Sequence, residues 1–270
     1  MNFFDFKKVI GIGSVEFFRY TVAAGLLWVF FYMIRRRHWL HRKIIDRLPN
    51  GRDVRRELAL SALTSFIYGV VGLLTVLAIR QGWTQYYSGM EKYGWAWFWL
   101  SVVITIFLHD AYFYWTHRIM HHPRLFPLMH KAHHRSTNPT PWAAYAFDPL
   151  EAFVQAAVFP LVVFLYPICA QAFLLFMLWQ LSFNVVGHAG FEIYPSWLLK
   201  SWLGKIFNTP TNHTMHHQYF RGNYGLYFNI WDRMMGTNHP DYEQRFHTVT
   251  TRRKTPGADS ASEAPAGLQP

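Results

Sequence analysis

The amino-acid sequence predicts an all-α integral membrane protein with about four transmembrane helices, including a hairpin, and a cytoplasmic histidine-rich helical cap that holds a di-metal site. Three observations predict this class. Of the 270 residues, 51% are hydrophobic and 19% are aromatic, which is more apolar side chain than a soluble domain of this length must bury. Long apolar segments recur along the chain, and three dense groups of histidine lie between or after them.

The first three apolar segments each predict a membrane-spanning helix. Residues 58–79 contain no charged side chain and are long enough for a hydrocarbon core that needs about 20 residues. Residues 20–34 are also free of charge and can lengthen toward Val9. Residues 95–108 open with Trp95, Trp97 and Trp99, the amphipathic rings that are enriched at a membrane boundary. We therefore expect three spans, the third of which runs into His109.

The fourth apolar segment is too long for one crossing. Between Glu151 and Glu192 no side chain is acidic or basic except His188. Pro160 and Pro167 interrupt this segment, and proline in a helix interior breaks or kinks the helix. Two helices folded as a hairpin fit the segment better than a single span.

The distribution of basic residues orients the predicted spans. Residues 35–56 contain nine Lys or Arg, whereas the loop after residue 79 offers only Arg80 and Lys92. The first loop should therefore be cytoplasmic. This topology places residues 110–150 and everything after Gly190 on the same face, in a bacterial cytoplasmic membrane or the endoplasmic reticulum. Because topology explains the basic loop, the net charge of +11 does not indicate a nucleic-acid partner.

The ends of the chain and its cysteine content set the domain organisation. Residues 250–270 show no apolar period and are rich in Pro, Gly, Ala and Ser, so we expect a disordered tail. Residues 1–249 are expected to form one membrane-embedded domain with a motif core at 95–240. The single cysteine, Cys169, lies in an apolar run and excludes both a disulfide framework and a cysteine-based zinc site.

The three histidine groups are the candidate site. Positions three and four apart on a helix lie on one face, about 5–6 Å from each other, so each group can direct two or three imidazoles toward one point. Thr209 followed by Pro210 predicts a helix start, and Pro127 is expected to open the helix that carries the second group. The groups are His117, His121 and His122; His130, His133 and His134; and His213, His216 and His217.

Crowding of this many imidazoles predicts metal binding, because protonated rings would repel one another whereas neutral rings are stabilised by a shared cation. His188 is expected to be a further ligand. His109, Asp110, His122 and Asp232 are candidates for positions that support the ligands. Eight or nine imidazoles exceed the needs of one tetrahedral zinc, so two metal ions are expected. Imidazole suits iron, zinc, copper and nickel alike, which leaves the metal open.

Two other site classes fit the residues less well. A zinc hydrolase is disfavoured because the sequence contains no His-Glu-x-x-His and no glutamate close to the histidine groups. The Glu-x-x-His helices of soluble di-iron proteins are also absent. A membrane metal-binding or metal-transport protein remains the alternative, although transporters place their ligands near the bilayer midplane and these groups lie outside the predicted spans.

The histidine groups and the residues around them resemble the fatty acid hydroxylase and sterol desaturase superfamily. The resemblance spans residues 95–240, and Pro139-Thr140-Pro141 together with the text around the third group is closest to C-5 sterol desaturases. Alkylglycerol monooxygenases are also similar. The segments that carry the resemblance read HDAYFYWTHRIMHHP, LMHKAHHRSTNPTPWAAYAFDPLEA, GHAGFE and NHTMHHQYFRGNYGLYFNIWDRMMGT.

The resemblance implies a membrane-bound oxidoreductase that hydroxylates or desaturates a sterol, fatty acyl or ether lipid, with two Fe²⁺ ions as cofactor and O2 as co-substrate. Tyr145 and Asp148 depart from the family pattern, since C-5 desaturases tend to have histidine there. No cytochrome b5 signature His-Pro-Gly-Gly occurs, so a cytochrome b5 or ferredoxin type of external electron donor with its reductase is implied. The implied ligands are His117, His121, His130, His133, His134, His213, His216 and His217, with His188 as an additional one.

Overall fold

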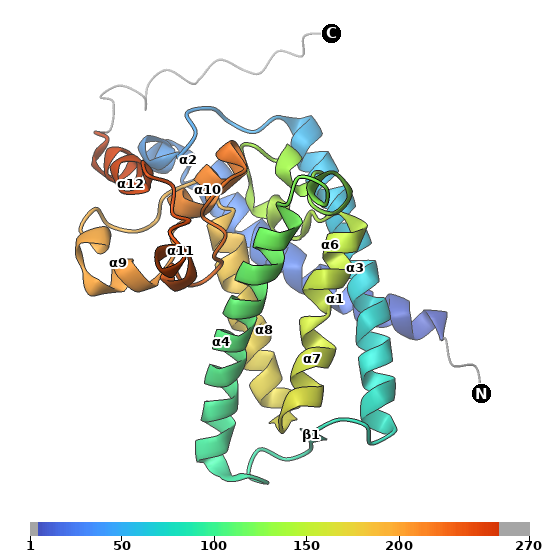
Figure 1. Ribbon diagram of the computed structural model, residues 1–270. Coiled ribbons are helices and arrows are strands. Elements are labelled where there is room, and N and C mark those ends of the chain that lie inside the picture. The colour runs from blue at the N-terminus through green and yellow to red at the C-terminus, as the bar shows by residue number, and fades with distance from the viewer. Residues whose placement is uncertain (1–4, 254–270) are drawn as a thin grey trace.

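The structure is a computed structural model that describes residues 5–253, and its regular structure is almost entirely helical (Figure 1). Of the segment predicted to be a disordered tail, Thr250 and Thr251 form the end of the last helix. Arg252 donates a hydrogen bond to the carbonyl oxygen of Lys43. Residues 254–270 lie outside the described part of the chain.

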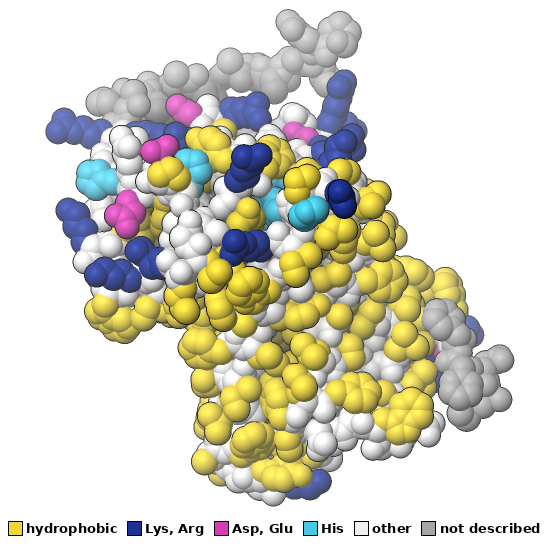
Figure 2. Space-filling view, in the orientation of Figure 1, with side chains coloured by type: hydrophobic (Ala, Val, Ile, Leu, Met, Phe, Trp, Pro, Cys, Tyr) yellow, Lys and Arg dark blue, Asp and Glu magenta, His cyan; other side chains and the backbone are white. Residues whose placement is uncertain are grey.

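Four helices are long and apolar enough to cross a membrane, so the chain is a multi-pass membrane protein as predicted. The first is α1 (Phe6–Trp28), which continues as the π-helical turn η1 (Val29–Ile34). The others are α3 (Gly51–Arg80), α4 (Gly94–Met120) and α8 (Ala170–Gly187). Figure 2 shows hydrophobic side chains over the lower part of the molecule, whereas Lys and Arg gather around its upper end.

The long helices extend beyond the predicted spans because polar residues start or continue them. The Asn50 side chain accepts a hydrogen bond from the backbone N–H of Asp53 and so caps the start of α3. Helix α4 continues past residue 108 for more than three turns, so His117 lies on the same helix as the third span. The hydrocarbon core accommodates about 20 residues of a helix, and the remaining turns carry this side chain toward the membrane surface.

The predicted hairpin is present, but its first arm is shorter and broken. Helix α6 (Pro149–Ala156) begins at a proline, and α7 (Val158–Leu165) follows after a break at Ala157. The break lies three residues before Pro160, which cannot donate the hydrogen bond that a continuous helix needs. Strand β2 (Ile168–Cys169) then pairs in parallel with β1 (Tyr86–Tyr87) and joins the hairpin to the loop between α3 and α4.

Glycine allows the first two membrane helices to approach closely. A Cβ atom on Gly69 of α3 would clash with the carbonyl oxygen of Val9 on α1. A Cβ atom on Gly13 would lie 2.9 Å from the carbonyl oxygen of Ser65. Small residues at such positions let helix backbones come into contact, which is how many membrane helices associate. Beside this contact, Tyr20 and Tyr68 belong to a hydrophobic cluster that also includes buried side chains of α6 and α8.

Short helices form the cap at the end of the bundle where α3 begins and α4 ends (Figure 1). All three histidine groups therefore lie at one end of the molecule, as the predicted topology requires. The cap consists of α2 (Arg36–Trp39), η2 (Leu40–Arg42), α5 (Phe126–Met129), η3 (His133–Arg135), η4 (Pro141–Tyr145), η5 (Leu198–Lys200), α9 (Trp202–Ile206), α10 (Pro210–Tyr219), α11 (Ile230–Met234) and α12 (Tyr242–Thr251).

Candidate metal centre

Nine imidazoles come together in two groups, within each of which the candidate ligand atoms all lie within 4.8 Å of one another. Eight of these side chains are buried, and His121 is partly buried. The five-histidine group consists of His117, His121, His130, His134 and His216. The four-histidine group consists of His133, His188, His213 and His217.

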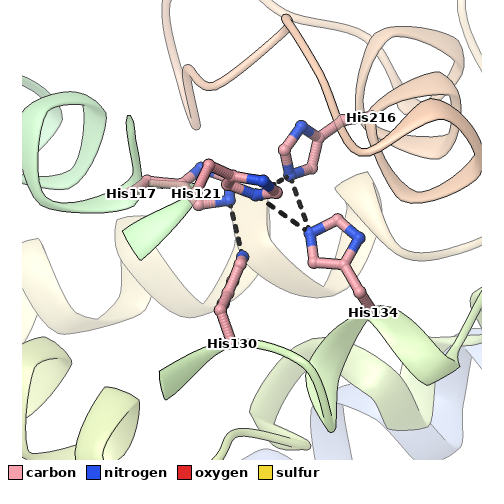
Figure 3. A group of neighbouring side chains, drawn as sticks. All are labelled: His117, His121, His130, His134 and His216. Atoms are coloured by element: carbon pink, nitrogen blue, oxygen red, sulfur yellow. Dashed lines mark hydrogen bonds between the residues drawn. The ribbon is translucent and has the colours of Figure 1, made fainter. Parts of the chain in front are cut away.

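The rings of the five-histidine group turn their Nε2 atoms toward one another (Figure 3). The Nε2 atoms of His117 and His130 are 2.9 Å apart, and those of His121 and His216 are 3.1 Å apart. Nε2 of His134 lies 3.0 Å from that of His216. Two nitrogens that are each about 2.1 Å from one ion, at right angles to each other, are about 3.0 Å apart. The spacing therefore fits ligands that share a cation.

The four-histidine group has the same spacing. The Nε2 atom of His188 lies 3.0 Å from that of His213 and 3.3 Å from that of His217. The Nε2 atoms of His213 and His217 are 3.2 Å apart. The ring centroid of His133 lies 4.6 Å from that of His217. Four converging imidazoles fit a second ion by their donor chemistry.

The local helix geometry explains how two of the sequence groups are divided between the two sites. His216 and His217 are consecutive on α10, so their side chains point about 100° apart, whereas His213 lies one turn before His217. His216 therefore joins the five-histidine group, and the other two join the four-histidine group. Two imidazoles of each sequence group converge on one point, as expected, and the third ring of this group and of the second belongs to the other site.

The second histidine group is not on one helix, contrary to the prediction from Pro127. Helix α5 ends at Met129 and His130 is its C-cap, while His133 and His134 lie on the 3-10 turn η3. This turn separates the last two rings, so that their centroids are 5.8 Å apart with perpendicular planes. The predicted start of α10 is confirmed, because Thr209 accepts a hydrogen bond from the N–H of Asn212 and Pro210 follows it.

Backbone carbonyl groups fix the tautomer of several rings. Nδ1–H of His117 donates to the carbonyl oxygen of Tyr224 at 2.8 Å, and Nδ1–H of His216 donates to that of Gly222 at 2.7 Å. Nδ1–H of His188 donates to the carbonyl oxygen of Asn184 at 2.7 Å. A neutral ring with its proton on Nδ1 carries a lone pair on Nε2. The facing Nε2 lone pairs would repel without a cation between them, so these rings fit a metal.

Glu151 is a buried carboxylate at the site that the sequence analysis missed. Its Oε2 atom lies 2.8 Å from Nδ1 of His130, and both side chains are 1% exposed. The expectation that no glutamate lies near the histidine groups is therefore wrong. The two residues are 21 positions apart, and η4 returns the chain to the site. The available signal was an acidic residue in the first turn of an apolar helix that starts with Pro149.

Burial keeps the cap histidines neutral. Loss of hydration lowers the pKa of His188 to about 4. Burial, followed by the charge of neighbouring imidazoles, holds the pKa values of His213, His216 and His217 well below the usual 6.5. At neutral pH these rings are therefore unprotonated, which is the form that binds a metal.

Of the four residues predicted to support the ligands, three are buried and form hydrogen bonds, and one is exposed. Asp232 is fully buried and accepts hydrogen bonds from the N–H groups of Tyr224 and Gly225, so it holds the loop whose carbonyl contacts His117. Asp110 accepts from the N–H groups of Tyr227 and Phe228, and His109 pairs through Nδ1 with the Tyr227 hydroxyl at 2.8 Å. His122 is exposed and lies in neither histidine group.

Residues 102–237 match the model of the family described as fatty acid hydroxylase, and this segment contains both histidine groups. The chain belongs to the fatty acid hydroxylase family. It is therefore an oxidoreductase enzyme of the class that modifies membrane lipids, as the resemblance of the histidine segments implied. Family membership and the two buried histidine groups agree on where the chemistry takes place.

Several characterised relatives are similar over most of the chain. A Delta(7)-sterol 5(6)-desaturase of Gibberella zeae is 29% identical over 230 residues, covering 85% of this chain and 67% of the relative. A second Delta(7)-sterol 5(6)-desaturase, from Aspergillus fumigatus, is 31% identical and covers 77% and 68%. Lathosterol oxidase of Homo sapiens is 28% identical and covers 68% and 61%. No solved structure matches the chain.

Proposed function

We propose that this chain is an O2-dependent di-iron oxygenase that hydroxylates or desaturates a membrane lipid, and that the lipid is a sterol. The observation that carries the proposal is the convergence of nine imidazoles, with facing Nε2 atoms 2.9–3.3 Å apart, at one end of a membrane-spanning bundle. The functional unit is the single domain formed by residues 1–249. The sterol assignment follows the relatives, which are named for sterol oxidation.

The nine histidines are the proposed ligands, with one ion in each group. Four oxygen-bearing groups contact Nδ1 of ligand rings and keep these rings in place. They are the carboxyl group of Glu151 and the backbone carbonyl groups of Asn184, Gly222 and Tyr224. Oxidation of an unactivated C–H bond requires a redox-active metal, which favours iron over zinc because Zn²⁺ has no redox chemistry. The bound ions supply the binding and reduction of O2, and the protein supplies neutral ligands and a buried site.

The electron balance of the proposed reaction requires a partner protein that donates electrons. Hydroxylation of R–H consumes O2, two electrons and two protons and yields R–OH and one water. Desaturation of a CH2–CH2 pair consumes the same reagents and yields the alkene and two waters. In both reactions the lipid provides two electrons and an external donor of the cytochrome b5 or ferredoxin type provides two. The donor meets the cap, which we place on the cytoplasmic side because residues 35–56 are strongly basic.

Lipid mass spectrometry of cells grown under ¹⁸O2 tests the function. Cells that express the wild-type chain should contain an oxidised sterol that is absent from cells expressing His133→Ala. His122→Ala is the matched control, because this exposed histidine lies in the same motif text but in neither group. A product with ¹⁸O indicates hydroxylation, and a new double bond without ¹⁸O indicates desaturation. Iron-loaded wild-type protein that changes no host lipid would contradict the proposal.

A further inference from the structure

One side of the five-histidine group reaches the protein surface. Among the nine candidate ligands, His121 is the one that is only partly buried. The ring centroid of Phe126 lies 5.3 Å from that of His121, and the ring centroid of Phe220 lies 4.9 Å from that of His134. Phe220 is 37% exposed, so a side chain that touches solvent also contacts a ligand ring. The four rings of the other group are all buried.

The backbone of Phe220 adopts a conformation that is costly for a residue with this side chain. Its φ is +61°, and it is the C-cap of α10 in the left-handed region, where glycine is the usual residue. Conformations of this kind cluster at functional sites, because the surrounding structure must hold them. Glycine at this position could not make the ring contact with His134. The contact is therefore a reason for phenylalanine at this position.

Basic side chains follow ligand residues directly in the chain on this side of the cap. Lys131 follows His130, and Arg135 follows His134. Consecutive side chains point in different directions, so the basic groups are exposed where the imidazoles are buried. Two further exposed arginines lie in the segments that carry Phe126 and Phe220. We call this surface the basic patch, and it consists of Arg124, Lys131, Arg135 and Arg221.

Few acidic side chains offset the charge of the basic patch. Residues 111–147 and 211–231, which carry eight of the nine candidate ligands, contain five Lys or Arg and no Asp or Glu. Asp148, the next acid along the chain, is partly buried and accepts the backbone N–H of Ala132. Figure 2 shows Lys and Arg near histidine side chains at the right of the upper end, and the visible Asp and Glu lie toward its left and top.

We propose that the basic patch is the docking surface of a small acidic electron-transfer protein, and that the donor docks beside the five-histidine group rather than the four-histidine group. This inference rests on the proposed function, because it gives the external donor a place on the chain. Each encounter with a one-electron donor delivers one electron, so two encounters supply the two external electrons of each turnover. Opposite charge brings the partners together and sets their orientation.

The two phenylalanines give the docked donor a short route to the metal centre. The rings of Phe126 and Phe220 are 5.9 Å apart, and each contacts an imidazole of the five-histidine group. The donor therefore reaches the ligand rings without entering the buried site. Anionic lipid head groups are a different partner for basic side chains, but they would not require this proximity to the ligands.

Equilibrium binding of acidic donors to the purified, iron-loaded full chain tests the surface. The probes are the soluble haem domain of a cytochrome b5 and a [2Fe–2S] ferredoxin, both chosen for negative net charge. The wild-type chain in neutral detergent should bind one of them, and the dissociation constant should rise at least about tenfold between about 50 and about 300 mM NaCl, because salt screens the charges.

A pair of double variants locates the binding. Arg124→Glu with Lys131→Glu should weaken binding of that donor at least about tenfold at the lower salt concentration, because the reversed charges repel it. Lys200→Glu with Lys205→Glu makes the same change in net charge at exposed lysines of η5 and α9, and it should bind within about twofold of the wild type. Iron content and the elution profile on size exclusion report whether each variant is folded.

Oxidation of the pre-reduced donor by the chain, followed by its absorbance, separates docking from the later steps. The variant of the basic patch should need at least about tenfold more donor for the half-maximal rate and should reach the wild-type maximum rate, because only the encounter is weakened. A variant with a damaged metal centre would instead lose the maximum rate.

Three results would overturn the docking surface. They are a wild-type chain that binds neither donor, equal donor binding by the two double variants, and a patch variant that loses binding to vesicles of anionic lipid but binds the donor unchanged. The first result is measured on unaltered protein, so it does not depend on the folding of a variant. Failure of the proposed function is distinguishable, because it appears as unchanged host lipids in the ¹⁸O2 experiment whether or not a donor binds.

Discussion

His133 and His134 are consecutive residues whose side chains belong to different histidine groups. Eight of the nine candidate ligands lie in the three spaced groups and His188 was expected separately, but the spacing did not show which of them share an ion. That assignment depends on the turn η3, where the backbone is not α-helical, and on the direction of each ring. Glu151 was not predicted because its contact with His130 forms only when the intervening loop folds back. The local sequence is therefore enough to predict which histidines can be ligands, whereas the tertiary structure decides which of them share an ion.

Glu151→Gln should reduce metal affinity about 10–100-fold, the usual effect of losing a partner behind a metal-binding imidazole. The amide cannot become an anion beside Nδ1 of His130 when that ring holds a metal ion. Retained metal is measured by plasma mass spectrometry after dialysis against graded chelator concentrations. Glu243→Gln is the control, since this glutamate is 68% exposed and pairs only with Arg233 among the described residues. Equal chelator resistance in both variants would contradict the role of Glu151.

Acidification should destabilise the protein and release its metal. The pKa of His188 is about 4 in the folded chain because of burial, against an ordinary value of 6.5. Between these pH values the unfolded chain binds more protons, so stability decreases as pH falls from about 6.5 toward 4. Protonated imidazole cannot bind a metal, which adds to the effect. The thermal unfolding midpoint and bound metal should both be lower at pH 5 than at pH 7.5, and a midpoint that is unchanged or higher at pH 5 would contradict this.

The secondary-structure elements were predictable where apolar length or capping residues define them. Thr209 and Pro210 correctly predicted the start of α10, and the charge-free segments predicted α1, α3 and α4. The break between α6 and α7 agrees with the interruption predicted from Pro160, but the short turns of the second histidine group were not predicted. Their geometry depends on packing against other helices rather than on local propensity. The Gly13 and Gly69 contact between α1 and α3 is a further tertiary feature.

Gly69→Val should destabilise the packing of α1 on α3. Its Cβ atom would meet the carbonyl oxygen of Val9, which is backbone and cannot move without shifting α1. Overpacking of this kind typically costs about 1–3 kcal/mol. The measurement is the midpoint of thermal unfolding in detergent, beside Gly11→Val, where no atom lies within 4 Å of the new Cβ position. If both valines lower the midpoint equally, the effect reflects helix propensity and not the close approach.

At the scale of the whole molecule, successive membrane spans run in opposite directions, and this brings histidines that are distant in the sequence to one end of the bundle. The basic loop of residues 35–56 and the hairpin of α7 and α8 were enough to predict this arrangement. A transporter with ligands at the midplane of the bilayer fits less well, since both histidine groups lie at the cap end of the bundle.

Membrane orientation follows from the same arrangement. A membrane-impermeant maleimide should label Ser88→Cys in intact cells and should label His122→Cys only after the cells are permeabilised, both in a Cys169→Ser background. Ser88 is exposed in the loop between α3 and α4, and His122 is exposed at the cap end. Labelling of His122→Cys in intact cells would place the cap outside and contradict the assignment from the basic loop.

Anomalous diffraction at the iron absorption edge can locate the metal ions that the nine histidines are proposed to hold. Crystals of the iron-loaded chain should show two peaks, one among the Nε2 atoms of the five-histidine group and one among those of the four-histidine group. Each ion should lie about 2.0–2.2 Å from its ligands. A chain purified with iron present that shows no anomalous peak within either histidine group would contradict the metal centre and, with it, the proposed oxidative function.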